Sequence, residues 1–301
     1  MFNMDQITIL SNNEMSEELC SYYKDLLNVK SLYDKGVTGK NLICAVIDSG
    51  CDINHPVFKD RIIGGINFTS EGCCTDYSDI NGHGTHVAGL ICSNKLNMFQ
   101  GGIALDAKLL ICKALGSNGS GSLDSLIHSI NYAIDNNVDV INMSLGGNVN
   151  SPELYQAVKR ADQKGITICC ASGNNGIGDN GTIDEFCYPG SYQEVIEVGA
   201  INKNNIPSYF SNSNTMIDCV SYGERIFSAF PGNRFALLDG TSQATPLVSG
   251  SLLLIKEWFI NEFGRRPSNE ELYAALIKCT VSLNSYSKKQ VGFGYIDLSK
   301  L

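Results

Sequence analysis

Three side chains that together could carry out nucleophilic hydrolysis occur in separate glycine-containing stretches of the chain. Asp48 ends an apolar run in Val-Ile-Asp-Ser-Gly, His83 lies in Asn-Gly-His-Gly-Thr-His, and Ser242 lies in Asp-Gly-Thr-Ser-Gln-Ala-Thr-Pro. A serine hydroxyl attacks a carbonyl when a histidine takes its proton, while a carboxylate fixes the imidazole tautomer and stabilises the imidazolium. The sequence therefore offers one candidate for each role.

Each candidate also has a purely structural interpretation. A serine ahead of a helix commonly caps it, and an aspartate after a strand commonly forms a turn. His83 and His86 are three residues apart and could bind a metal, although no carboxylate lies between them as it does in the zinc hydrolases. These alternatives stay open at the level of single motifs.

Ser242 precedes a stretch that predicts a buried helix. The apolar run Leu252–Ile255 and its neighbours predict a helix that continues to about residue 263 and is too hydrophobic for a surface position. We expect Pro246 to lie in its first turn, where a missing N–H costs nothing. A hydroxyl at such a helix start faces unpaired N–H groups and the positive end of the dipole.

Two further polar stretches follow apolar runs. Asn174 lies in Cys-Ala-Ser-Gly-Asn-Asn-Gly, where its amide could donate to an oxyanion or simply belong to a β-turn. Ser144-Leu-Gly-Gly147 has small residues that leave an accessible backbone edge. An extended peptide could add to that edge as a strand.

Alternating apolar and helical segments predict the fold. Strands are expected at residues 42–47, 108–113, 138–143, 167–171 and 195–200. Helices are expected at residues 83–93, 122–136, 151–164 and 269–280, besides the one after Ser242. The pattern predicts a single α/β domain with a doubly wound, mostly parallel sheet flanked by helices. Sites in such sheets form at the carboxyl ends of strands, where Asp48 lies.

The composition excludes several function classes. With 301 residues and a net charge of −9, the chain is not expected to bind nucleic acid or anionic membranes. No run approaches the roughly 20 apolar residues of a transmembrane helix, and the N-terminus is not typical of a signal peptide. The twelve cysteines are scattered and lack the spacing of a zinc site. They indicate a reducing, cytoplasmic location without structural disulfides.

Taken together, the four stretches resemble the subtilisin-like serine proteases, or subtilases. The matching segments, in the family's order and spacing, are Asp-Ser-Gly at 48–50, His-Gly-Thr-His-Val-Ala-Gly at 83–89, Ser-Gly-Asn at 172–174 and Gly-Thr-Ser at 240–242. The order Asp, His, Ser differs from that of chymotrypsin and the α/β-hydrolases. Residues 50–56, 62–69 and 119–121 are similar to the intracellular subtilisins, and the resemblance covers about residues 30 to 298.

The resemblance implies a subtilisin-like fold and serine endopeptidase activity on proteins or peptides. Ser242 would be the nucleophile, His83 the general base and acid, and Asp48 the group that orients the imidazole. Asn174 and the Ser242 N–H would form the oxyanion hole. A homo-oligomer is compatible with the sequence.

The resemblance also implies a set of substrate-binding residues. The peptide backbone would pair with two segments, consisting of Gly119, Ser120 and Gly121 and of Ser144, Leu145, Gly146 and Gly147. The pocket for the residue before the cut would be lined by Ala171, Ser172, Gly173 and Cys187. Because this lining is neutral, we expect a preference for apolar or medium-sized side chains.

Some positions depart from the family. Gln243 and Leu247 replace its usual methionine and histidine beside the nucleophile, and Val57 replaces an acidic calcium ligand. No cofactor is expected for the chemistry, and a tight calcium site is not expected without that carboxylate. A weaker cation site could use Gly190, Tyr192, Val195 and Asp218.

Residues 1–30 form an N-terminal extension to the peptidase domain at 31–301. A short strand at 6–10 and an acidic helix at 15–27 are expected there. The extension is too short for a folded propeptide, so we expect residues 5–14 to lie across the active site as a removable inhibitor, with a solvated terminus as the alternative. A dedicated leader-peptide or zymogen processing peptidase, and a non-catalytic pseudoprotease, are the alternative functions.

Overall fold

A nine-stranded sheet forms the centre of the protein. The computed structural model describes residues 8–9, 17–177 and 181–301. The strands are β2 (Ile43–Asp48), β3 (Ile62–Asn67), β4 (Lys108–Lys113), β5 (Val140–Met143), β6 (Thr167–Ala171), β7 (Val195–Ile201), β8 (Ile217–Tyr222), β11 (Thr280–Val281) and β12 (Tyr295–Ile296). Their order is β11-β12-β8-β7-β6-β5-β2-β4-β3, and all neighbours are parallel except β11 and β12.

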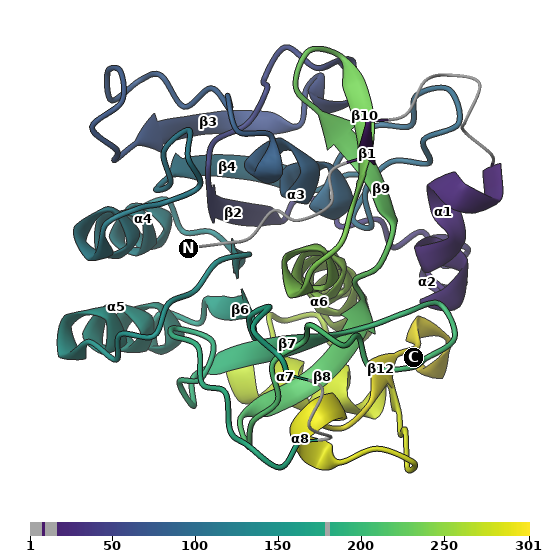
Figure 1. Cartoon of the computed structure of the whole chain (residues 1–301). Helices are drawn as coiled ribbons and strands as arrows, with labels where there is room; N and C mark the ends of the chain where they lie inside the picture. Colours follow the sequence, from purple (N-terminus) through teal and green to yellow (C-terminus); the bar gives the residue numbers. More distant parts are fainter. Residues whose placement is uncertain (1–7, 10–16, 178–180) are drawn as a thin grey trace.

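Helices cover both faces of this sheet, as Figure 1 shows. One face carries α3 (His83–Ile91) and α6 (Thr241–Phe263), and the other carries α4 (Leu123–Asp135) and α5 (Pro152–Gln163). The remaining helical segments are α1 (Glu17–Leu26), α2 (Lys30–Tyr33), α7 (Asn269–Lys278), α8 (Lys288–Val291), η1 (Pro56–Phe58) and η2 (Leu298–Lys300). Alternate residues of each central strand enter opposite cores, so these strands are apolar without interruption.

This architecture confirms the predicted single-domain α/β fold with a mostly parallel sheet. The five predicted strands and the predicted helices are present, with ends shifted by a few residues. The sequence analysis missed β3, which contains Gly64 and Gly65, and β8, which alternates apolar and polar residues at its start. Glycine and a partly polar pattern weaken the strand signal even where tertiary packing imposes a strand.

A small antiparallel sheet lies beside the main one. It consists of β9 (Ile226–Phe230), β10 (Arg234–Leu238) and β1 (Thr8–Ile9), with Thr8 opposite Leu237 and Ile9 opposite Ala236. The strand predicted at 6–10 is confirmed for its two described residues, and the rest of it lies outside the described residues. The predicted acidic helix is confirmed as α1.

One expectation and one alternative about the helix that contains Ser242 are wrong. The helix begins at Thr241 and its N-cap is Gly240, so Ser242 is not the cap and Pro246 lies in the second turn. Because Pro246 has no N–H, the carbonyl of Ser242 lacks its usual helical partner. The hydroxyl of Ser144 donates to that carbonyl at 2.8 Å instead. The proline is tolerated because the side chain of Ser144, which directly follows β5, replaces the lost bond.

A buried lysine attaches α1 to the rest of the molecule. Lys24 is 5% exposed, and its Nζ donates to three carbonyl oxygens, those of Gln100 (2.8 Å), Gly101 (3.3 Å) and Gly102 (2.9 Å). An ammonium group has three N–H donors, so this arrangement uses all of them. Burial, with a smaller effect from Lys95, lowers the pKa of Lys24 to about 7. The three carbonyls oppose that effect because they favour the charged form.

We predict that Lys24→Met lowers the free energy of unfolding by about 2–4 kcal/mol, since it leaves buried carbonyls without a donor. Urea denaturation followed by circular dichroism measures the change. Lys30→Met is the matched control, because Lys30 is exposed and its ion pair within the described residues is with Asp34. Equal stabilities of the two variants would contradict the role assigned to Lys24.

Candidate active site

The structure brings Asp48 and His83 into direct contact at the carboxyl end of β2. The ring Nδ1–H of His83 donates to Asp48 Oδ1 at 2.8 Å and Oδ2 at 3.0 Å. The Asp48 side chain is fully buried, whereas that of His83 is 13% exposed. The main-chain N–H of Ser49 also donates to Asp48 Oδ1 at 2.7 Å. With Nδ1 protonated, Nε2 of the neutral ring is free to accept a proton.

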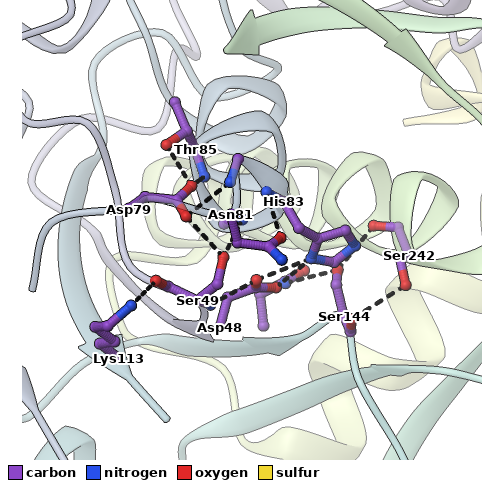
Figure 2. A network of polar contacts seen from close by, with 12 residues as sticks. Asp48, Ser49, Asp79, Asn81, His83, Thr85, Lys113, Ser144 and Ser242 are labelled. Carbon is purple, nitrogen blue, oxygen red and sulfur yellow. Dashed lines mark hydrogen bonds and ion pairs between the residues drawn. The ribbon is translucent and has the colours of Figure 1, made fainter. Parts of the chain in front are cut away.

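Asp79 fixes the start of α3, and with it the position of His83. Its carboxylate accepts the N–H groups of Gly82 (2.8 Å) and Thr85 (2.8 Å) and the hydroxyls of Thr85 (2.6 Å) and Ser49 (3.0 Å). Figure 2 shows this network beside the ring of His83. The carboxylate thereby connects the first turn of α3 to the end of β2.

Gly84 allows α3 to approach the end of β2 closely. A Cβ at this position would lie 2.2 Å from the carbonyl oxygen of Gly50, which is backbone and cannot move aside cheaply. The main-chain N–H of Gly84 donates to the hydroxyl of Ser49 at 2.9 Å. The glycine at position 84 is therefore required by the main chain of Gly50.

Ser242 is held near the imidazole by a reciprocal pair of bonds with Ser144. The Ser242 hydroxyl donates to the Ser144 carbonyl at 3.0 Å, and the Ser144 hydroxyl donates to the Ser242 carbonyl at 2.8 Å. Figure 2 shows the Ser242 side chain pointing toward the His83 ring on the side away from Asp48. The main-chain N–H of Ser242 is among the first four of α6, which have no carbonyl partner within the helix.

Asn174 lies next to the nucleophile loop with its amide orientation fixed. Its Oδ1 accepts the N–H of Thr241 at 2.9 Å and the hydroxyl of Thr241 at 2.8 Å. The carbonyl end of the amide therefore faces Thr241, and Nδ2 is the free end. A Cβ built on Gly240 would lie 3.2 Å from this Nδ2. Because Gly240 is two residues before Ser242, the amide nitrogen lies close to the loop that carries the serine.

The charge environment favours a protonatable His83. Burial acts to lower the pKa of His83, but the charge of Asp48, its hydrogen bond to the ring and the charge of Asp79 together raise it above its ordinary value. His86 behaves differently, since burial and the neighbouring His83 lower its pKa to about 3. The Nε2 of His86 donates to the carbonyls of Ile226 (3.0 Å) and Ala236 (3.2 Å).

These contacts bear on the alternative that His83 and His86 share a metal. The Nε2 of His86 is directed to carbonyls of the small sheet, while the Nδ1 of His83 is directed to Asp48. Across the described residues, no group of three histidine, cysteine, aspartate or glutamate side chains is placed to hold a metal ion. The two histidines therefore have separate roles.

An open groove runs beside the predicted substrate-binding segments. Its walls include Gly121 and Leu123 on one side and Leu145–Gly147 on the other. The other lining residues are Ala114, Leu115, Ser122, Leu126, Val149, Leu154 and Tyr188. Gly119 and Ser120 belong to a turn next to it, in which the Ser120 carbonyl accepts the N–H of Gly116. Gly147 is already bonded to Tyr188 through both main-chain groups, which leaves Gly146 as the accessible part of this edge.

The residues predicted to line the pocket for the side chain before the scissile bond also lie near the groove. Ala171 ends β6, and Ser172 and Gly173 continue from it toward Asn174. The Cys187 sulfur lies against Gly146, because a Cβ on Gly146 would be only 2.3 Å from it. Burial, helped by the charge of Glu197, raises the pKa of Cys187 to about 12, so this thiol is protonated and a poor nucleophile.

The predicted weak cation site is not assembled around a free carboxylate. Both Asp218 oxygens accept hydrogen bonds, from the Tyr273 hydroxyl (2.7 Å) and from the Glu197 N–H (2.8 Å). The carbonyl of Tyr192 accepts the N–H of Val195, within the segment that follows Gly190. The cation site thus stays a prediction, and Asp218 would have to release a partner to serve it.

The comparison with known families agrees with this geometry. Residues 39–294 match the model of the Subtilase family. This chain is a subtilase. It is accordingly a serine endopeptidase.

Individual relatives extend the comparison. The Major intracellular serine protease of Bacillus subtilis (strain 168) is 45% identical over 294 residues, covering 97% of this chain and 90% of that protein. The Intracellular serine protease of Paenibacillus polymyxa is 49% identical over 263 residues, covering 87% and 80%. Subtilisin E of Bacillus subtilis (strain 168) is 40% identical over 229 residues, covering 76% and 59%.

Sequence reasoning missed several residues that shape the site of this subtilase. Thr241, which orients Asn174, lies within a motif but received no role, and Asp79, which fixes α3, was not singled out. Leu123 and Leu126, on the first turn of α4, face the groove. Their spacing of three on an amphipathic helix, directly after a predicted substrate segment, was the available signal. There was no signal for Glu197 in the sequence, because the pattern around a glutamate in a strand does not show whether it is buried or exposed.

Proposed function

We propose that this subtilase cleaves peptide bonds with Asp48, His83 and Ser242 as its catalytic triad. The observation that carries the proposal is the buried Asp48 carboxylate, which accepts the Nδ1–H of His83 while Ser242 lies on the opposite side of the ring. This arrangement sets the imidazole tautomer and compensates the positive charge that the ring acquires.

The proposed reaction proceeds in two halves. After rotating away from the Ser144 carbonyl, Ser242 transfers its proton to Nε2 of His83 and attacks the peptide carbonyl. The resulting oxyanion accepts hydrogen bonds from Asn174 Nδ2 and the Ser242 N–H. His83 then protonates the leaving amine, which leaves an acyl-enzyme. Water, activated by the same histidine, hydrolyses this ester. Side chains perform every proton transfer, and we propose that no cofactor is required.

The groove supports an extended protein segment as substrate. Gly146 offers main-chain groups to a peptide strand, and Leu123 and Leu126 line an apolar wall beside it. We therefore propose that an apolar side chain a few residues before the cut binds against these leucines. An exposed, unfolded segment satisfies this requirement, whereas a folded helix does not present its backbone edge.

We further propose a cytoplasmic location. Eleven described cysteines are free thiols, nine of them buried, which fits a reducing compartment. Two of the relatives are named intracellular serine proteases. The described helices are all too short or too polar to span a bilayer.

The N-terminal extension is proposed to inhibit the enzyme until it is cut. Thr8 and Ile9 pair with β10, and that strand leads within a few residues to Gly240 and Ser242. The extension is therefore anchored beside the segment that delivers the nucleophile. Most of residues 5–14 lie outside the described residues.

A fluorophosphonate probe tests the triad and the extension together. We expect the full-length protein to label at Ser242 only as intact mass shows loss of N-terminal residues, since the extension then no longer blocks the site. Ser242→Ala should neither label nor trim itself. Prompt labelling without mass loss would leave the triad standing and remove the self-inhibition, and failure to label even after trimming would favour a pseudoprotease.

Removal of the proposed oxyanion donor should affect rate rather than folding. We predict that Asn174→Ala lowers kcat by about 10²–10³-fold, the usual cost of losing one such donor. Peptide hydrolysis by trimmed enzyme measures the rate, and thermal melting shows that the fold is kept. Asn175→Ala, one residue further along, is the control. A similar kcat for the two variants would remove Asn174 from the mechanism.

The pH dependence should report on His83. The base works only when neutral, and its pKa is raised above 6.5 by Asp48 and Asp79. We therefore predict that kcat/KM falls as the pH drops through a value above 6.5, with a slope of one proton. Hydrolysis of a neutral peptide between about pH 5 and 9 gives the profile. A midpoint well below 6.5 would contradict the assigned environment of the ring.

A further inference from the structure

Two adjacent cysteines lie at the surface, in a turn that follows the edge strand β3. Cys73 and Cys74 are exposed, whereas the other nine described cysteines are buried. The N–H of Asp76 donates to the Cys73 carbonyl at 2.9 Å, which closes a β-turn from Cys73 to Asp76. The proposed mechanism uses neither thiol, and both are accessible to reagents in solution.

The surroundings of Cys73 favour its thiolate form. The hydroxyl of Thr75 lies 3.1 Å from the Cys73 sulfur. Hydrogen bonds from this hydroxyl and from the Thr75 N–H lower the pKa of Cys73 below its ordinary value. In the nine buried cysteines, by contrast, burial raises the pKa. An accessible thiol with a lowered pKa beside a second thiol is the usual pattern of a redox-sensitive cysteine.

Asn67, the last residue of β3, binds the main chain of both cysteines. Its N–H donates to the Cys74 carbonyl at 2.8 Å. Its Nδ2 donates to the carbonyls of Cys73 (3.3 Å) and Glu71 (2.6 Å). Asn67 is 4% exposed, so these bonds are shielded from water. One buried side chain therefore holds the two cysteines and Glu71 in a common arrangement.

Glu71 connects this turn to the predicted substrate-binding segment. Its carboxylate accepts the Ser117 N–H at 2.8 Å and the Ser117 hydroxyl at 3.0 Å. Gly116 lies against it, since a Cβ there would be 2.6 Å from Glu71 Oε1. The main chain of Gly116 bonds in turn to Gly119 and Ser120, which are predicted to pair with the substrate. The contacts thus run from two exposed thiols to the edge of the groove.

We propose that Cys73 and Cys74 form a reversible disulfide with each other, and that this disulfide weakens the binding of extended substrates. The inference rests on the proposed peptide cleavage and assigns a regulation to its substrate-binding edge. In a reducing compartment both thiols are free, and the turn holds Glu71 against Ser117. A more oxidising state closes the disulfide and releases the substrate segment.

The oxidant is a disulfide of low molecular weight, such as oxidised glutathione. The Cys73 thiolate attacks one of its sulfur atoms, which forms a mixed disulfide and releases one thiolate. Cys74 then loses its proton to solvent and attacks the Cys73 sulfur, which closes the protein disulfide and releases the second thiolate. Two protein thiols are oxidised, one external disulfide is reduced, and the two protons pass through solvent to the released thiolates.

Closure of this disulfide must change the main chain of the turn. Bonded cysteines usually have Cα atoms about 4.4–6.8 Å apart, whereas consecutive Cα atoms lie about 3.8 Å apart across a trans peptide bond. The ring therefore requires altered dihedral angles at Cys73 and Cys74. These rotations turn their carbonyls away from Asn67, which then no longer fixes Glu71. The strain also makes the disulfide easy to reduce, as a reversible modification requires.

The full-length Ser242→Ala variant tests the thiol chemistry without catalysis. After incubation with oxidised glutathione, we expect peptide mapping to show a disulfide between Cys73 and Cys74. Ser242→Ala/Cys74→Ser should instead keep a glutathione adduct on Cys73, because no second thiol completes the reaction. A lasting adduct on Ser242→Ala itself, or no reaction at Cys73, would overturn the proposal.

Hydrogen exchange tests the connection to the substrate segment. In oxidised Ser242→Ala, the Ser117 N–H should exchange at least about fivefold faster than in the reduced protein, because it loses its bond to Glu71. Ser242→Ala/Cys73→Ser/Cys74→Ser, treated in the same way, should show no such change. If exchange in residues 116–121 is the same before and after closure, the proposed connection is wrong.

The kinetic readout in the wild type is a split between KM and kcat. Closure should raise KM about fivefold for a peptide long enough to reach residues 119–121, the cost of about one net hydrogen bond. The kcat, and the KM of a short ester, should stay unchanged, and dithiothreitol should restore the original KM. An equal loss of kcat for both substrates would contradict the proposal.

These measurements separate the thiol pair from the proposed reaction. If the disulfide forms and hydrogen exchange changes, but the reduced wild type cleaves neither substrate, the proposed function fails and the modification site stands. If the reduced enzyme cleaves both substrates and oxidation leaves the KM of the long peptide unchanged, the proposed function stands and the regulation fails.

Discussion

The buried pair of Asp48 and His83 is the constraint on which the rest of the site depends. A fully buried carboxylate without a partner would cost several kcal/mol, so β2 can end in aspartate only where donors meet it. The Ser49 N–H and the His83 ring supply these donors. The ring reaches Asp48 because α3 begins next to the end of β2. The close contact of Gly84 with Gly50 permits this position of the helix, and the hydrogen bonds of Asp79 stabilise it.

Ser242 is positioned by a second set of compensating contacts. Pro246 removes one helical hydrogen bond inside α6, and the freed Ser242 carbonyl accepts the Ser144 hydroxyl. The proline thus couples α6 to the residue that follows β5, because Ser144 supplies the hydrogen bond that the helix lacks. Thr241, in turn, orients the amide of Asn174, which lies in the segment after β6.

The order of the strands brings the predicted pocket residues together. Because β6 lies between β5 and β7, the groups around the pocket come from three successive parallel strands and the loops after them. Parallel pairing sets Cys170 opposite Glu197, so these two side chains point to the same face of the sheet. A glutamate one position earlier or later would point into the opposite core, because side chains alternate along a strand.

The sequence by itself determined the family and the α/β class and singled out Asp48, His83, Asn174 and Ser242 as the candidates for the site, because these depend on short motifs and on apolar periodicity. It did not determine where α6 begins. Helix propensity favours proline in the first turn, and the contact with Ser144 explains why Pro246 is tolerated in the second turn. It also could not reveal Glu197 beside Gly190 or Lys24 beneath Gln100. Those contacts join residues far apart in the chain, and burial of charge is decided by packing. Tertiary structure therefore decided the electrostatics of the site, while local sequence decided its chemistry.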